Sequence, residues 1–90
     1  MLRYYIILHG RVQGVGLRYR TSMSAREFGL TGWVKNLDDG NVALEVQGEK
    51  RDLDAFMKSL FKNDYFIRID DYSIKEISPL PTETRFNVTF

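Results

Sequence analysis

Hydrophobic positions along the first third of the chain form a strand-like run and then a helix-like stripe. Leu2 to His9 is short and rich in Tyr and Ile, which is typical of a β-strand. A glycine-punctuated loop from Gly10 to Gly16 follows, and the next apolar spacing is helical. We expect this helix to start at Leu17 and to end at Gly29, a residue suited to a left-handed C-terminal cap. Its apolar face consists of Leu17, Thr21, Ala25 and Phe28.

The middle of the chain predicts a hairpin and a second helix. Thr31–Leu37 and Asn41–Gln47 are expected to be antiparallel strands, joined by a turn at residues 38–40 that contains two Asp and one Gly. The second helix has the clearest amphipathic pattern, and Asp52 is its expected N-cap. Its wide apolar stripe consists of Leu53, Phe56, Met57, Leu60 and Phe61.

The last third has the composition of strands again. Phe66–Ile69 and Tyr72–Ile77 are predicted strands, prolines at 79 and 81 mark a loop, and residues 86–90 alternate as a final strand. We therefore expect the order βαββαβ over a single domain of residues 1–90. This order favours an α+β, ferredoxin-like sandwich in which an antiparallel sheet carries two helices on one face.

Composition and charge narrow the class of partner. The chain has no cysteine, which excludes disulfides, thiolate metal sites and a cysteine nucleophile and fits the cytoplasm. Its apolar runs are too short for a membrane span, and no leader pattern opens the chain. Residues 1–36 carry six basic residues and one acid, a net charge of +5, whereas residues 37–90 carry seven and eleven, a net charge of −4. Because nucleic-acid binding favours a broad basic surface, a small anionic ligand bound near the start of the chain is the better expectation.

The loop before the first helix has the chemistry of an anion site. Gly14 and Gly16 allow positive φ angles, so that successive backbone N–H groups can face one point beside the N-terminus of the helix. Arg18 falls in the first helical turn, where a cation is unfavourable unless an anion compensates for it. The loop lacks the Lys-Ser or Lys-Thr pair of a nucleotide P-loop and the spacing of a dinucleotide fingerprint.

These residues resemble the acylphosphatase family, whose signature joins Gly-x-Val-Gln-Gly-Val-x-Phe-Arg to Gly-Trp-Val-x-Asn-x-x-x-Gly-x-Val. The first pattern matches residues 10–18 and the second matches residues 32–42, at the expected separation and in a chain of the usual length. One departure is Leu17, where the family usually has Phe or Met; this apolar exchange is expected to affect packing more than chemistry.

The resemblance implies an enzyme that hydrolyses acyl phosphates to a carboxylate and inorganic phosphate by direct attack of an oriented water. Arg18 and Asn36 would be the catalytic residues: Arg18 would bind the phosphoryl group and Asn36 would hold the water. Neither a metal nor a cofactor is implied, and a cytoplasmic monomer without a nucleic-acid or membrane partner is expected. The backbone amides that would bind the phosphoryl group belong to Val12, Gln13, Gly14, Val15, Gly16, Leu17 and Arg18.

Two alternatives to a free-standing enzyme remain. One is a non-catalytic phosphate- or RNA-binding module that presents Tyr4, Tyr5 and Tyr72 to bases, although the aromatic-rich RNA-recognition signature is absent. The other is a module of the kind found in larger maturation enzymes.

Several conspicuous side chains are expected to be structural. A lone histidine, His9, has no metal-ligand or base partner nearby, and Trp33 is expected in the core. Arg11 and Arg20 are interpreted as solvated surface charges near the site.

Overall fold

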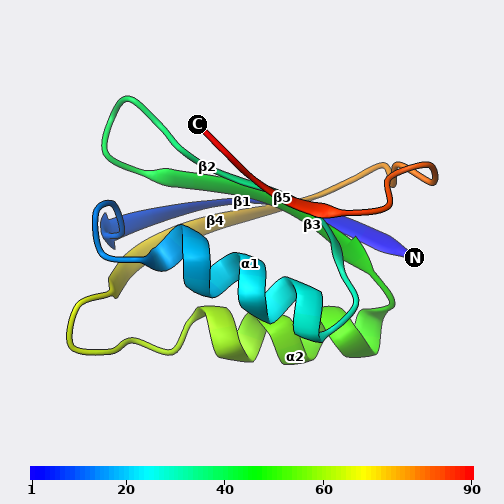
Figure 1. The fold of residues 1–90 in the computed structure, drawn as a ribbon, viewed down its shortest axis with the longest axis horizontal. Helices are drawn as coiled ribbons and strands as arrows, with labels where there is room; N and C mark the ends of the chain where they lie inside the picture. Colours follow the sequence, from blue (N-terminus) through cyan, green and yellow to red (C-terminus); the bar gives the residue numbers. More distant parts are fainter.

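A computed structural model describes residues 1–90 as a five-stranded sheet with both helices on one face (Figure 1). The strand order is β4-β1-β3-β2-β5. The helices lie alongside one another beneath the sheet, so the ferredoxin-like prediction is confirmed. The elements are β1 (Leu2–Arg11), α1 (Leu17–Glu27), β2 (Thr31–Asn36), β3 (Val42–Gly48), α2 (Lys50–Leu60), β4 (Arg68–Ile77) and β5 (Phe86–Thr89).

The last strand departs from the expected antiparallel sheet. The pairs β1–β3, β1–β4 and β2–β3 are antiparallel, but β5 pairs parallel with β2, with Gly32 opposite Phe86 and Lys35 opposite Thr89. The cause is the path of residues 78–85, here called the crossing segment. This segment carries the chain from β4 at one edge of the sheet to β5 at the other, and β5 then runs in the direction of β2.

The largest differences from the predicted strand boundaries are in β1 and β4. β1 continues past His9 to Arg11, because a register shift between His9 and Gly10 lets its pairing with β4 resume. β4 is one strand of ten residues where the sequence predicts two shorter ones. Asp70 and Asp71 suggest a break, but both side chains are exposed on an edge strand and do not interrupt it.

Helix ends follow the prediction at α1 and differ at α2. Gly29 has a φ of +70° after α1, as expected for a left-handed cap. The N-cap of α2 is Glu49, and Asp52 lies instead in the first turn, where its negative charge interacts favourably with the helix dipole.

The core lies between the helices and the facing side of the sheet. Period-two alternation directs Val34 into this layer and Trp33 to the opposite face, so the expectation of a core Trp33 is wrong. Trp33 is half-buried there and meets Tyr5 edge to face at 6.3 Å between ring centroids. Fifteen buried residues form the core: Ile6, Leu8, Val12, Leu17, Ala25, Leu30, Val34, Val42, Leu44, Val46, Leu53, Phe56, Leu60, Ile67 and Phe86.

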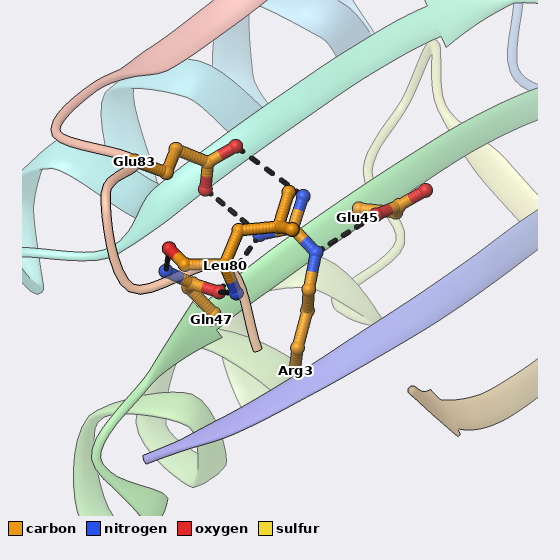
Figure 2. A network of polar contacts seen from close by, with 5 residues as sticks. All are labelled: Arg3, Glu45, Gln47, Leu80 and Glu83. Carbon is orange, nitrogen blue, oxygen red and sulfur yellow. Dashed lines mark hydrogen bonds and ion pairs between the residues drawn. The ribbon is translucent and has the colours of Figure 1, made fainter. Parts of the chain in front are cut away.

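A buried arginine anchors the crossing segment to the face of the sheet opposite the helices (Figure 2). Arg3 has no exposed surface and donates to Glu45 at 2.8 Å and to Glu83 at 2.8 and 3.3 Å. It also donates to Gln47, whose side chain exchanges two hydrogen bonds with the backbone of Leu80. Burial lowers the pKa of Arg3, but the hydrogen bonds and charges of Glu83 and Glu45 outweigh this and raise it above its ordinary value. The network thus ties β1 and β3 to the segment that leads into β5.

Candidate active site

The connection from β1 to α1 leaves a run of backbone donors without protein partners. This glycine loop, residues 12–16, has positive φ angles at Gly14 (71°) and Gly16 (81°). None of its amides donates a hydrogen bond within the protein, and the first hydrogen bond at the start of α1 runs from Arg20 to the Gly16 carbonyl at 3.0 Å. No acidic residue and no capping side chain occupies this end of α1. Such an end binds anions through its free N–H groups and the helix dipole.

Arg18 projects from the first turn of α1 and has no carboxylate partner. One guanidinium nitrogen, Nη1, donates to the carbonyl of Thr89 at 3.1 Å, and Cζ lies 4.8 Å from the centroid of the Phe90 ring. The end of β5 therefore holds the guanidinium in place, and its remaining donors stay free for a ligand.

Asn36 ends β2 beside these groups, and its side chain makes no hydrogen bond to the protein. Its Oδ1 atom is buried without a partner. An unsatisfied buried amide is costly in a structural position, so this one is suited to a ligand or water.

A pocket of about 270 Å³ brings these elements together. Two of the sequence-predicted groups, Arg18 and Asn36, both line it, together with parts of the glycine loop. Of the predicted loop residues, Gln13 and Val15 do not line the pocket. The lining residues are Val12, Gly14, Gly16, Leu17, Arg18, Tyr19, Asn36, Val88 and Phe90. Sequence reasoning missed Tyr19, Val88 and Phe90, and Arg18 is the one lining side chain that is charged.

The Gln13 side chain has a role that sequence reasoning also missed. Its Nε2 donates to the carbonyls of Leu37 and Asn41, at 2.7 Å each, and so joins the glycine loop to the β2–β3 turn. The same turn begins directly after Asn36, so Gln13 fixes the two parts of the pocket relative to each other.

Other polar residues near the loop are engaged in structure. Arg20 was expected to be a solvated charge, but it donates to the carbonyls of Leu60 and Lys62, each at 2.9 Å, and caps the end of α2. It also contacts Asp64, and the pKa of Asp64 is lowered, first by hydrogen bonds from the backbone N–H groups of Ile67 and Phe66. Arg11 is exposed and makes no ion pair, as expected.

His9 also has a structural contact. Its Nδ1 lies 2.9 Å from Oδ1 of Asn41, in keeping with the expected structural role. No group of three or more metal-ligating side chains occurs in the structure, and neither helix reaches the length and hydropathy of a membrane span.

The three tyrosines invoked for RNA binding do not form a platform. Tyr4 packs against the core beneath the sheet, whereas Tyr5 lies on the opposite face against Trp33. Tyr72 packs against Phe61, with 4.5 Å between ring centroids. Their separation over two faces does not favour the RNA-binding alternative.

This chain is similar to known proteins over most or all of its length. The family model described as Acylphosphatase matches residues 4–88. The chain is 41% identical to an acylphosphatase of Bacillus licheniformis over the full length of both chains. It is similar to the crystal structure of acylphosphatase from Bacillus subtilis, with a TM-score of 0.93, 40% identity and full coverage of both chains. A domain that makes up 12% of HypF from T. kodakarensis is also similar, with a TM-score of 0.86 and 36% identity over all of this chain.

Proposed function

Because this chain belongs to the acylphosphatase family, we propose that the pocket lined by Arg18, Asn36 and the glycine loop is where it hydrolyses acyl phosphates. The products are a carboxylate and inorganic phosphate. The observation that carries this assignment is the placement of Arg18 and Asn36 in one pocket, beside amides that have no partner in the protein.

Binding of the phosphoryl group uses charge and backbone donors. The amides of residues 12–18 and the guanidinium of Arg18 bind the phosphoryl oxygens, and a planar guanidinium can donate two parallel hydrogen bonds to them. The amides of the glycine loop can bind the anion without first breaking a hydrogen bond within the protein. Preorganised donors of this kind stabilise the charge on the phosphoryl oxygens in the transition state.

The attacking water is held by the side-chain amide of Asn36. The oxygen of this water attacks phosphorus as the bond between phosphorus and the acyl oxygen breaks, and the carboxylate leaves with the bonding electrons. A carboxylate is a good leaving group and needs no general acid. No side chain in the pocket lining is a carboxylate or an imidazole, so a phosphoryl oxygen is the proton acceptor at hand.

Separate substitutions test the two roles. Arg18→Ala is expected to remove both competitive inhibition by inorganic phosphate and turnover of benzoyl phosphate, because it removes the charge that binds the anion. Asn36→Ala is expected to leave the phosphate inhibition constant near normal and to lower kcat by about 10²–10³, because it removes a group that positions the water.

The control is Arg11→Ala, which removes an exposed arginine outside the pocket and is expected to change neither quantity. All assays contain a metal chelator, and activity is expected to persist. An equal loss of phosphate affinity in the Arg18 and Asn36 variants would show that the roles are misassigned.

We further propose a single-domain, cytoplasmic monomer that works without a nucleic-acid partner. One core connects β1 to β5, and cysteine is absent. Light scattering of the active protein is expected to give the mass of one chain, 10.5 kDa. Activity confined to dimers would reject the proposal.

A further inference from the structure

Besides its phosphate-binding groups, the pocket has apolar lining residues such as Val88 and Phe90. The hydrolysis reaction does not determine which part of a substrate these residues contact. We propose that Phe90, together with Tyr19, forms a binding rim for the acyl group and selects neutral, apolar acyl phosphates, aromatic ones above all. This inference rests on the proposed function. It concerns the part of the substrate that leaves as the carboxylate.

The position of Phe90 follows from its contact with Arg18. The ring centroid lies 4.8 Å from Cζ of Arg18, and Thr89 accepts a hydrogen bond from the same guanidinium. A phosphoryl group bound by Arg18 therefore lies next to this ring. The acyl carbon is joined to phosphorus through a single oxygen, so the acyl group begins within reach of the ring.

Both aromatic residues of the rim have solvent-exposed surface that a ligand could cover. The Phe90 side chain is 92% exposed and Tyr19 is 70% exposed, although both line the pocket. Binding is stabilised when a ligand covers exposed aromatic rings beside a pocket, because apolar surface is removed from water. Flat aromatic ligands cover such rings best. An acyl group that carries a ring would bury more of this surface than an acetyl group.

Charge disfavours acyl groups that carry a second anion. Arg18 is the one charged side chain in the lining, and its guanidinium is already engaged by Thr89 and the phosphoryl group. No second cation lines the pocket to pair with a distal carboxylate or phosphate. Such a group would lose hydration without gaining a partner.

The first experiment compares benzoyl phosphate with acetyl phosphate, using the ratio of their kcat/KM values. Both substrates have the same phosphate group. If Phe90→Ala weakens phosphoryl binding by Arg18, it lowers both kcat/KM values by the same factor and leaves their ratio unchanged. Phe90→Ala is expected to lower the benzoyl-to-acetyl ratio roughly 5- to 20-fold, and Phe90→Tyr is expected to retain it. The matched control is Tyr65→Ala, which removes an aromatic side chain that is 88% exposed and lies outside the pocket.

A second experiment uses the unaltered protein and does not depend on a variant's folding. Butyryl and succinyl phosphate have acyl chains of equal length, but succinyl carries a terminal carboxylate. We expect kcat/KM to be higher for butyryl phosphate by roughly 10-fold or more at low salt.

The outcomes separate this inference from the function on which it rests. An unchanged benzoyl-to-acetyl ratio in Phe90→Ala would overturn the acyl rim, and so would equal rates with butyryl and succinyl phosphate. A parallel loss for both substrates together with a weaker phosphate inhibition constant would show that Phe90 acts through Arg18 alone, which also overturns it. If the unaltered protein hydrolysed none of these substrates, the proposed function itself would fail.

Discussion

At the scale of single residues, Gln13 shows how the pocket depends on a side chain that faces away from it. Its amide nitrogen donates to two carbonyls at opposite ends of the β2–β3 turn, and both contacts are 2.7 Å long. These bonds hold the glycine loop against the strand end that carries Asn36. A small shift of the loop would change the angle at which the proposed water attacks the phosphoryl group. The alignment of reacting groups strongly affects the rate.

Replacement of Gln13 is therefore expected to affect stability and activity together. Gln13→Ala should lower the free energy of unfolding by about 1–3 kcal/mol and kcat/KM by roughly tenfold, because two carbonyls each lose one of their two donors and the loop loses its link to the turn. Gln13→Glu should be the more damaging change near neutral pH, since it places a carboxylate against the same carbonyls. Urea titrations and benzoyl phosphate kinetics measure both effects. If Glu were tolerated better than Ala, the donor role of Gln13 would be wrong.

Sequence reasoning reached the local chemistry of the pocket but not its tertiary partners. Arg18, Asn36 and the glycine loop belong to recognisable motifs, and the structure brings them together. The partners of Gln13 lie 24 and 28 residues further along the chain, and neither is marked by side-chain type because both are backbone carbonyls. Phe90 and Val88 read simply as alternating residues of a strand, since their place beside Arg18 depends on the parallel pairing of β5.

At the scale of elements, the crossing segment determines where β5 lies. β4 and β5 occupy opposite edges of the sheet, and the connection between them is anchored by Arg3 through Glu83 and by Gln47 through Leu80 (Figure 2). This anchor lies at the end of the sheet where β1 begins, whereas the pocket lies at the end where β2 and β5 finish. We infer that β5 transmits the anchor's position along its length to Thr89.

Loss of the buried arginine is expected to loosen β5 before the rest of the sheet. Arg3→Met should cost about 3–5 kcal/mol of stability, because it leaves Glu45 and Glu83 without their shared cation. Glu83→Gln, which keeps a hydrogen-bond acceptor, should cost about 1–3 kcal/mol.

Amide hydrogen exchange provides the local measurement for these variants. Protection in β5 should fall more than protection in the β1–β3 ladder, since β5 has one neighbouring strand. Uniform loss of protection across the sheet would contradict the idea that the anchor acts on β5.

Element types could be predicted from local patterns, but directions and ends could not. The helix and strand periodicities identified both helices and the strands β1, β2, β3 and β5, but they divided β4 into two strands. The parallel direction of β5 depends on the route of the crossing segment, which local periodicity does not encode. The start of α2 was placed too late, because Asp52 is a favoured cap residue and Glu49 is not, yet no side chain caps this helix.

At the scale of the whole molecule, an anion that binds only the folded pocket must also stabilise the fold. Inorganic phosphate at about one hundred times its dissociation constant should add about 2.7 kcal/mol of stability. For a domain of this size, that corresponds to a rise in Tm of roughly 10–20 °C. Calorimetry with phosphate, compared with chloride at equal ionic strength, measures the shift. It should vanish in Arg18→Ala and persist in Arg11→Ala, and the reverse pattern would place the anion elsewhere.

The hydrogen bond from Arg18 to Thr89 spans 71 residues of sequence, which has a consequence for biosynthesis. A ribosome makes the glycine loop long before β5, the strand that holds its arginine in place. Until β5 is made, the nascent chain carries free amides and an unsupported cation, and catalysis has to wait for that strand. Nascent chains that stop before β5 should therefore show no turnover, because Arg18 lacks its contact with Thr89.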